Sequence, residues 1–176
     1  MNTVYIISGP AGVGKSTTSK KLVKNLTRSS YISGDTVSHI PVMGRGKPWL
    51  DKDTNDLTWK NIRSITENLL DYEYDVVIDY VTFPREAHWL KEQLMNRQNI
   101  KIVYVVLLVD QDTIQYRDQL RQPEVRMGER SLILLSEFEN DTELAESNKL
   151  YTQSYSVEQL DEIIATILED DKFILR

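Results

Sequence analysis

The chain has 176 residues, enough for one domain with a hydrophobic core, and its 40% apolar and 27% charged residues are typical of a globular protein. The net charge of −6 argues against broad electrostatic binding to nucleic acid or to an anionic membrane, although a local basic pocket is compatible with it. Without cysteine there is no disulfide framework, and no apolar run approaches the roughly 20 residues of a membrane helix. A strand is expected two residues after Met1, which leaves no room for a signal peptide, so we expect a cytoplasmic protein.

A glycine-rich segment near the start of the chain fits a phosphate-binding pattern. Residues 9–16 read Gly-Pro-Ala-Gly-Val-Gly-Lys-Ser and match G-x-x-x-x-G-K-[ST]. Residues 3–8 are uncharged and mostly β-branched or aromatic, which predicts a buried strand, and residues 17–26 predict a helix after the segment. The alternative is a glycine-rich turn without a ligand, but the agreement of motif and context favours a phosphate-binding loop.

Such a loop binds a triphosphate largely through its backbone. Glycine adopts positive φ without steric cost, and this lets successive N–H groups converge on a phosphate at the positive end of a helix. We expect Lys15 to reach the β- and γ-phosphates of ATP as a catalytic residue, and the Ser16 hydroxyl to bind Mg²⁺. The residues expected to contact ATP are Gly9, Ala11, Gly12, Val13, Gly14, Lys15, Ser16 and Thr17.

The rest of the chain alternates strand and helix patterns, which indicates βαβ units around a parallel sheet. Further strands are expected at residues 30–33, 75–81, 100–109 and 149–154, with the long apolar run 100–109 as the central strand. Helices are expected at residues 53–72, 84–97, 112–121, 128–139 and from 156 onward. The segment between the first two helices, residues 36–52, is expected to be irregular because it contains two prolines and two glycines.

Polar residues mark the expected helix starts. Caps are expected at Asp53 or Thr54 and at Asp112 or Thr113. Residues 156–159 form a capping-box pattern, and Val157 is expected on the buried face of the last helix. The apolar tail, residues 173–175, is expected to pack back on the domain.

Two acidic residues are expected at the carboxyl ends of predicted strands, where ligands bind in parallel α/β sheets. Asp35 follows the second strand, and we interpret it as the carboxylate that orients an acceptor hydroxyl, takes its proton and contributes to the metal site. The alternative for Asp35 is an ordinary Gly-Asp turn. Asp79 ends the third strand and is expected to hold Mg²⁺ through water or to bind the acceptor; the alternative is a cap of the next turn.

Arginines form a second cluster, expected to make a helical lid at about residues 118–132. Arg117 and Arg121 lie four residues apart on one helix face, and Arg126 and Arg130 follow across a proline-containing segment. Phosphoryl transfer needs mobile positive charge that also excludes water. We therefore expect Arg117 and Arg121 to act in catalysis and Arg126 to approach the substrate. The alternative is a solvated charged helix, because acidic residues are interleaved.

The acceptor is expected to bind to the loop and helix at about residues 35–72. His39, Arg45 and Trp49 lie in the irregular segment and are candidate acceptor contacts. Trp59 lies on the predicted helix and is expected in the core rather than in the pocket. His88 is interpreted as structural or solvated.

With these residues in view, the chain resembles the P-loop small-molecule kinases, which include gluconate, shikimate, chloramphenicol and nucleoside-monophosphate kinases. Gly34-Asp35, His39 and the segment 46–53 are similar to a stretch of gluconate kinases in which Gly-Asp-x-x-His precedes Gly-x-Pro-Leu-x-Asp-x-Asp. This chain has one extra residue before His39 and a tryptophan within the later segment.

Two further segments carry the resemblance. Asp79 with Phe83-Pro84-Arg85 is similar to Asp-Gly-Phe-Pro-Arg of adenylate kinases, with two extra residues and no glycine, and this implies Arg85 as an acceptor contact. Arg117-Asp118-x-x-Arg121 is similar to the helix that leads into the lid of these kinases, whose arginines approach the nucleotide, and this implies that Arg117 contacts it. The resemblance implies an α/β, three-layer P-loop NTPase fold with a five-stranded parallel sheet of order 2-3-1-4-5, helices on both faces, a small helical lid, and the cofactors ATP and Mg²⁺.

We therefore predict one P-loop kinase domain, residues 1–176, that transfers the γ-phosphate of ATP to a hydroxyl of a small metabolite. We expect a monomer or weak homodimer without a membrane or nucleic-acid partner. Two alternatives stay open: a kinase of nucleotides or nucleic-acid ends, for which more basic residues would be expected near residues 36–52, and a non-catalytic ATP-binding or ATPase module.

Overall fold

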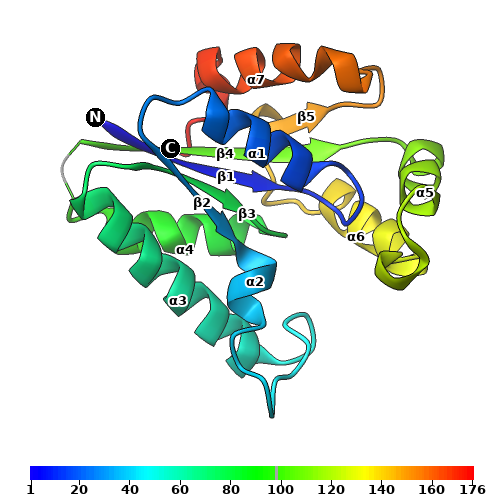
Figure 1. The fold of residues 1–176 in the computed structure, drawn as a ribbon, viewed down its shortest axis with the longest axis horizontal. Coiled ribbons are helices and arrows are strands. Elements are labelled where there is room, and N and C mark those ends of the chain that lie inside the picture. The colour runs from blue at the N-terminus through cyan, green and yellow to red at the C-terminus, as the bar shows by residue number, and fades with distance from the viewer. Residues whose placement is uncertain (98) are drawn as a thin grey trace.

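A five-stranded parallel sheet forms the centre of the computed structural model, which describes residues 1–97 and 99–176. The strand order is β2-β3-β1-β4-β5, as expected from the resemblance (Figure 1). The strands are β1 (Asn2–Ser8), β2 (Ser29–Ser33), β3 (Asp75–Asp79), β4 (Ile100–Leu108) and β5 (Lys149–Tyr151). This arrangement confirms the predicted fold class.

Helices cover both faces of the sheet, so that the molecule has three layers. In Figure 1, α1 and α7 lie on one face, and α3, α4 and α6 lie on the other. The rings of Phe83, which precedes α4, and Phe138 of α6 stack at 4.3 Å, which joins the two helices on that face. The α-helices are α1 (Lys15–Lys24), α2 (Gly34–Ser38), α3 (Lys52–Asp71), α4 (Pro84–Leu94), α5 (Gln111–Gln119), α6 (Glu129–Glu139) and α7 (Leu160–Glu169). Four short 3₁₀ helices are η1 (Pro123–Val125), η2 (Glu146–Asn148), η3 (Val157–Gln159) and η4 (Asp171–Phe173).

The central strand is β1, because it pairs with β3 on one side and β4 on the other. The prediction that residues 100–109 form the central strand is therefore wrong. Strand β4 lies between β1 and β5, and helices cover both of its faces. Every residue from Ile102 to Leu108 is therefore buried, which explains the long apolar run. Two-sided burial gives a continuous apolar run in any interior strand of a parallel sheet.

Several element boundaries differ from the expected ones. Residues 34–38 form the short helix α2 rather than irregular chain, since the Ser33 hydroxyl accepts a hydrogen bond from the Thr36 N–H at 3.2 Å and nucleates a turn. Helix α1 begins at Lys15, two residues earlier than expected, because it starts directly from the left-handed residue Gly14. Strands β3 and β5 and helix α4 are shorter at their C-terminal ends than predicted.

The predicted helix caps are also shifted. Asp110, not Asp112 or Thr113, caps α5, and its carboxylate accepts a hydrogen bond from the Thr113 N–H at 2.7 Å. Asp51 occupies the cap position of α3 in place of Asp53 or Thr54. In both helices the cap lies before the expected residue, because several adjacent polar residues carry the same sequence signal.

The C-terminal region follows the prediction in part. The capping box is present, with the Ser156 N–H bonded to Gln159 Oε1 at 3.1 Å. Val157 is nevertheless 83% exposed, because it lies in η3 ahead of the amphipathic helix α7, so its predicted burial is wrong. The tail packs back as expected: Phe173 is fully buried, and Ile174 forms an antiparallel bridge with Val103 of β4.

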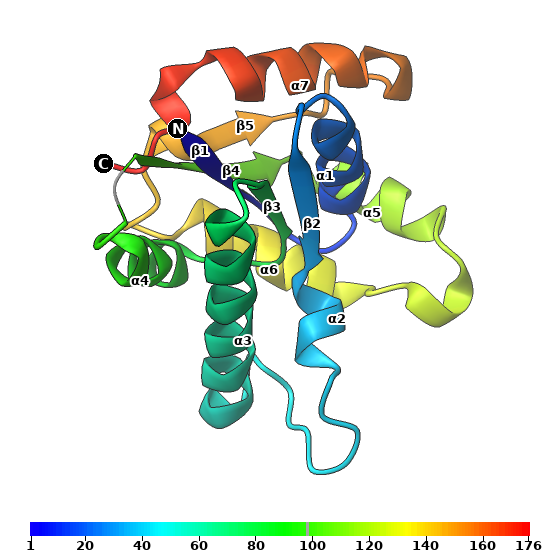
Figure 2. The same ribbon diagram turned by 60° about the vertical axis from the view of Figure 1, so that its left-hand side comes forward.

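Two segments extend from the carboxyl end of the sheet, opposite the two chain termini (Figure 1). One is the 39–51 loop, which connects α2 to α3 beyond the body of the sheet (Figure 2). The other is the lid segment, residues 118–132, which connects α5 to α6 through η1. Among the described residues, no helix is both long and apolar enough to cross a membrane.

Candidate nucleotide and acceptor site

The phosphate-binding pattern forms a tight turn between β1 and α1. Gly9 has a φ of 131°, and a side chain there would overlap the carbonyl oxygen of Leu107 in β4. Gly14 has a φ of 111° in open space, so only its backbone conformation requires glycine. These glycines set the backbone from which α1 begins at Lys15, and this is the strand-loop-helix context that the motif requires.

Lys15 is the centre of a cluster of charged groups. Its Nζ donates a hydrogen bond to the Pro10 carbonyl at 2.9 Å, so the side chain folds back along its own loop. Burial lowers the pKa of Lys15 to about 8, aided by the charge of Arg121, while the carboxylates of Asp79 and Asp35 oppose the shift. Three residues predicted from other parts of the sequence, Asp79, Asp35 and Arg121, are thus near enough to Lys15 for their charges to affect its pKa.

Asp79 is buried at the carboxyl end of β3, and only 6% of it is exposed. Its Oδ2 accepts a hydrogen bond of 2.6 Å from the Tyr31 hydroxyl of the neighbouring strand β2. Burial and the negative charge of Asp79 raise the pKa of Tyr31, while the nearby Ser16 hydroxyl opposes the shift. Tyr31 was not among the predicted site residues, because a tyrosine in a strand ordinarily indicates β-propensity and packing.

Asp35 lies in the first turn of α2, with an exposed carboxylate. A side chain at Gly34 would overlap the Tyr80 ring, so glycine lets α2 approach the residue that follows β3. His39 ends α2, and its Nδ1 lies 2.6 Å from the Asp35 carbonyl oxygen, which turns the exposed ring back on the helix. Asp35 therefore has a fixed backbone and a free carboxylate.

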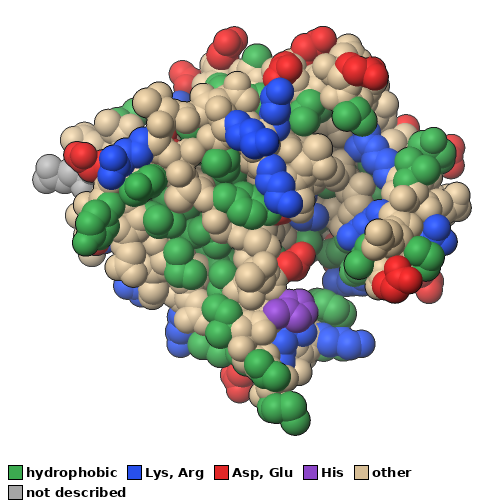
Figure 3. Space-filling model, in the orientation of Figure 1, with side chains coloured by type: hydrophobic (Ala, Val, Ile, Leu, Met, Phe, Trp, Pro, Cys, Tyr) green, Lys and Arg blue, Asp and Glu red, His purple; other side chains and the backbone are tan. Residues whose placement is uncertain are grey.

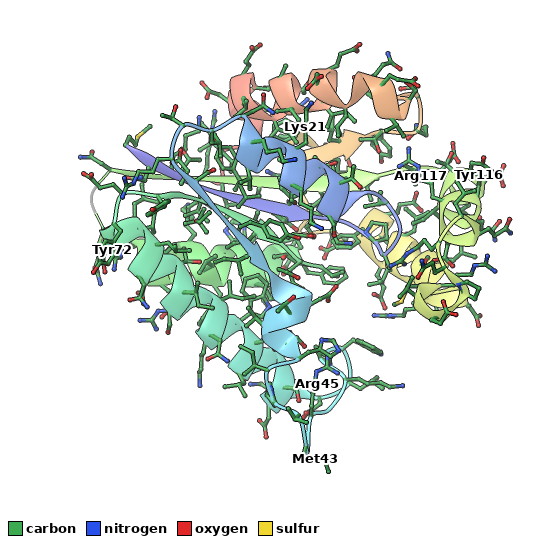
Figure 4. All side chains as sticks on the ribbon, viewed as in Figure 1. Lys21, Met43, Arg45, Tyr72, Tyr116 and Arg117 are labelled. Carbon is green, nitrogen blue, oxygen red and sulfur yellow. The ribbon has the colours of Figure 1, made fainter. Side chains whose placement is uncertain are left out.

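Arg117 connects the phosphate-binding loop to α5. Its Nη1 donates to the Val13 carbonyl at 2.8 Å, and its Nη2 donates to the Thr152 carbonyl at 3.4 Å, beyond the end of β5. Figure 4 shows the side chain at the base of α5, on the side of the sheet end. Burial lowers the pKa of Arg117, with Asp110 opposing. Arg117 therefore contacts the phosphate-binding loop directly, and its role at the nucleotide stays a prediction.

The lid segment is held by Asp118, a residue that the sequence had suggested only as part of a solvated charged helix. Asp118 is buried and accepts hydrogen bonds from the N–H groups of Met127 at 2.9 Å and Gly128 at 2.8 Å. Burial alone would raise its pKa, but these two hydrogen bonds and the charge of Arg121 lower it. No local pattern could have identified this role, because it depends on a contact ten residues along the chain.

Two arginines that were predicted to bind the substrate, Arg126 and Arg45, donate hydrogen bonds to nearby backbone carbonyls. Arg126 donates to the carbonyls of Arg121 at 3.0 Å and Gln119 at 2.8 Å, which closes the end of α5 onto the lid segment. Arg45 donates to the Ser38 carbonyl at 2.6 Å and the Ser38 hydroxyl at 2.8 Å. Both arginines organise their own segments through these bonds.

Polar contacts also shape the 39–51 loop. The Gly46 N–H donates to Thr54 Oγ1 at 3.0 Å, and Thr54 Oγ1 donates to Asp51, so the loop is tied to the start of α3. A cavity of about 270 Å³ lies beneath it, between α2 and α3. Met43 lies at the tip and points away from the body of the protein (Figure 4).

Trp49 joins the 39–51 loop to Arg130, in the first turn of α6 and within the lid segment. The guanidinium of Arg130 lies 5.2 Å from the Trp49 ring centre, and the ammonium of Lys47 lies 5.8 Å from it. Trp49 is still 51% exposed. Figure 3 shows a hollow between the loop and the lid, with Lys and Arg side chains along its rim. Trp59, by contrast, is buried against Tyr80, as expected for a core residue.

Arg85 lies in the first turn of α4 and is exposed. Its charge contributes to lowering the pKa of Asp56 in α3, after the larger effects of the Lys52 hydrogen bond and charge and of Lys60. Arg85 is therefore near enough to Asp56 for its charge to act there, and its role at the acceptor stays a prediction.

The oxygen atoms near the phosphate-binding loop are suited to bind Mg²⁺ only when a nucleotide supplies further ligands. Ser16, Asp79 and Asp35 offer hard oxygen atoms, but within residues 1–97 and 99–176 no set of three His, Cys, Asp or Glu side chains is arranged to hold a metal ion. Mg²⁺ commonly binds one or two carboxylates and completes its shell with water and phosphate oxygens. The residues present fit that mode.

Comparison with known proteins places this chain in a family. The family model described as AAA domain (AAA_33) matches residues 4–137, which is most of the chain. The chain belongs to the AAA domain family. A comparison of this AAA domain with curated proteins finds no significant match.

Solved structures share the fold of this AAA domain along nearly its whole length. The tunicamycin resistance protein of Deinococcus radiodurans is 17% identical, with 96% of each chain covered and a TM-score of 0.67. The APS kinase of Mycobacterium tuberculosis, solved with AMPPNP and APS, is 16% identical, with 96% of this chain and 98% of that chain covered and a TM-score of 0.67. A gluconokinase from Sinorhizobium meliloti 1021 is 18% identical, with 94% and 89% covered and a TM-score of 0.65. These likenesses confirm the resemblance to P-loop kinases at the level of the fold.

Proposed function

We propose that this protein is an ATP-dependent phosphotransferase that transfers the γ-phosphate of ATP to a hydroxyl group of a small metabolite. The observation that carries the proposal is the phosphate-binding loop between β1 and α1, with Lys15 folded along it and near enough to Asp79, Asp35 and Arg121 for their charges to act on its pKa. A phosphate cradle alone would suit a binding module. A free carboxylate beside the lysine adds what transfer to a hydroxyl requires.

The phosphate-binding loop would hold the triphosphate through the N–H groups of residues 11–16. Lys15 would exchange its hydrogen bond with the Pro10 carbonyl for contacts with the β- and γ-phosphates, where its charge is most useful. When bound with ATP, Mg²⁺ supplies positive charge that neutralises the β- and γ-phosphates, and Ser16 and Asp79 are the residues that would hold it.

Asp35 is the residue that would activate the acceptor. The acceptor oxygen forms a bond to the γ-phosphorus, the bond between that phosphorus and the β–γ bridging oxygen breaks, and the hydroxyl proton passes to the Asp35 carboxylate. The products are ADP and the phosphorylated metabolite. The exposed carboxylate of Asp35 and the fixed backbone of α2 are suited to this role.

The lid segment would supply charge and exclude water. Arg121 lies close enough to Lys15 to influence its pKa, and its Nη1 is 3.5 Å from Asp118 Oδ1, so a small movement would direct it to the phosphates. Water exclusion favours transfer over hydrolysis because the acceptor must compete with water for the γ-phosphorus. Arg117 anchors the base of the lid to the loop.

A screen of ATP consumption tests the proposal. The protein is mixed with MgATP and single members of a panel of sugars, sugar acids, nucleosides, phenicols, aminoglycosides and short oligonucleotides, and the products are identified by phosphorus NMR. We expect one small-molecule class to accelerate ADP formation with a new phosphate-ester signal. Labelled oligonucleotide ends would instead support a nucleic-acid kinase, and slow hydrolysis that no acceptor accelerates would contradict the proposal.

A further inference from the structure

Asp79 is held by a neutral partner from an adjacent strand. Tyr31 is in β2 and Asp79 ends β3, and the register of these parallel strands pairs Tyr31 with Val77 and Ser33 with Asp79. The phenol therefore reaches forward by two residues along β3 to donate to Asp79 Oδ2 at 2.6 Å. This contact connects the edge strand to the residue expected near the metal.

We propose that Tyr31 is a positioning residue for the magnesium–nucleotide complex, acting through Asp79. Its hydroxyl holds one carboxylate oxygen, Oδ2, and leaves Oδ1 for the magnesium-bound water. The inference rests on the proposed ATP site and names a residue that the phosphate-binding pattern does not contain.

The first physical reason is the burial of Asp79. A buried carboxylate requires hydrogen-bond donors, and a hydroxyl-to-carboxylate hydrogen bond is among the stronger ones. Without Tyr31, Oδ2 would lose its donor, and the carboxylate would be free to rotate. The phenol therefore fixes one orientation of a group that must meet its ligand in a defined position.

The second reason is the charge of the partner. A lysine or arginine at the place of Tyr31 would neutralise Asp79 and reduce its attraction for a divalent cation. A phenol satisfies one oxygen and leaves the full negative charge of the carboxylate. The ammonium of Lys15 stays available for the phosphates, because Asp79 does not depend on it for a hydrogen bond.

The test is the binding of ADP with and without Mg²⁺, measured by calorimetry on the full chain. In Tyr31→Phe we expect the affinity for ADP in EDTA to be unchanged, because the phosphate-binding loop is intact. We expect the additional affinity that Mg²⁺ gives to fall about tenfold or more, which is the usual effect of removing a hydrogen-bond partner of a metal ligand. Equal magnesium dependence in Tyr31→Phe and in the unmodified protein would overturn the inference.

Tyr104→Phe is the matched control. It removes another tyrosine hydroxyl of the sheet, in a fully buried residue where Tyr31 is half-buried; this O–H donates to the Thr82 carbonyl at 2.7 Å and does not contact Asp79. We expect its magnesium dependence to equal that of the unmodified protein. An equal loss in both variants would assign the effect to general loosening of the core and overturn the inference.

A double-mutant cycle with Asp79→Asn shows whether Tyr31 acts through Asp79. If it does, Tyr31→Phe causes no further loss of magnesium affinity in the Asp79→Asn background. A loss of the same size in both backgrounds would overturn the inference while leaving the proposed function intact. If the unmodified protein binds neither ADP nor MgADP, the proposed function fails together with the inference.

Discussion

The phosphate side and the acceptor side of this site are built in different ways. Around the phosphate-binding loop, charged side chains are partly or fully buried and have defined partners, such as Lys15 with Pro10 and Asp79 with Tyr31. In the 39–51 loop, Arg45 donates a hydrogen bond to the nearby Ser38 carbonyl, and the side chains that face the hollow are exposed. The difference indicates that one side recognises a constant ligand and the other side a variable one, because exposed side chains on a loop change without disturbing a core.

Replacing Lys15 should give the largest effect on the phosphate side. In Lys15→Ala we expect kcat to fall by about a hundredfold or more, because the ammonium acts on charge that develops during transfer. Steady-state kinetics measures the loss, and circular dichroism checks the fold. Lys21→Ala is the control, since Lys21 pairs at the surface with Asp161 at 2.7 Å. Normal turnover in Lys15→Ala would remove the basis of the mechanism.

The next largest effect is expected from replacing Asp35, and it concerns the rate of phosphoryl transfer itself. Asp35→Asn should lower kcat by about a hundredfold, because the amide keeps the shape of the side chain but accepts no proton. Rapid-quench measurement of a single turnover separates this step from product release. A normal single-turnover rate would limit Asp35 to holding the acceptor.

The affinity for ATP should depend on pH through Lys15. Its pKa is lowered to about 8 in the free protein, and bound phosphates favour the protonated form, so the complex has the higher pKa. Between these two values binding takes up a proton, and the affinity falls as the pH rises, by about tenfold from pH 7 to pH 9. Calorimetry in two buffers of different ionisation enthalpy measures the proton uptake. Lys15→Arg should bind ATP with little dependence on pH in this range, because an arginine stays charged.

The smallest effect is expected on the acceptor side. Trp49→Ala removes the ring between Arg130 and Lys47, contacts that are worth about 0.5–1 kcal/mol each at exposed positions. We expect the KM of the acceptor to rise several-fold while the affinity for ATP stays the same. Leu50→Ala is the control, because Leu50 is an exposed neighbour in the same loop. Equal effects on ATP and acceptor would contradict the division of the site into two sides.

The same division explains what the sequence could predict. The sheet, its surrounding helices and the phosphate-binding loop follow from local patterns: uncharged β-branched runs, helical periodicity and a spaced glycine motif. Helix α2 was missed because five residues beginning with glycine carry no periodic signal. The central position of β1 is a property of strand pairing, which a single apolar run does not encode.

The site residues divide in a similar way. Lys15, Asp35, Asp79, Arg117 and Arg121 were predicted from their place in a motif, on a helix face or at a strand end, and their roles stay predictions. Tyr31 and Asp118 were missed because their roles depend on partners 48 residues away along the chain or in the lid turn. Arg45 and Arg126 look like free charges in the sequence, and only the structure shows that backbone carbonyls are their partners. Their predicted roles at the substrate remain predictions.

The hydrogen bonds of Arg117 couple the movements of different parts of the chain. One guanidinium bridges the phosphate loop at Val13 and the chain beyond β5 at Thr152, and it is rooted in the helix that carries the lid. Three segments distant in sequence are thereby coupled at a single point. A displacement of the Val13 carbonyl would therefore be transmitted through this guanidinium both to the base of the lid and to the chain at residue 152.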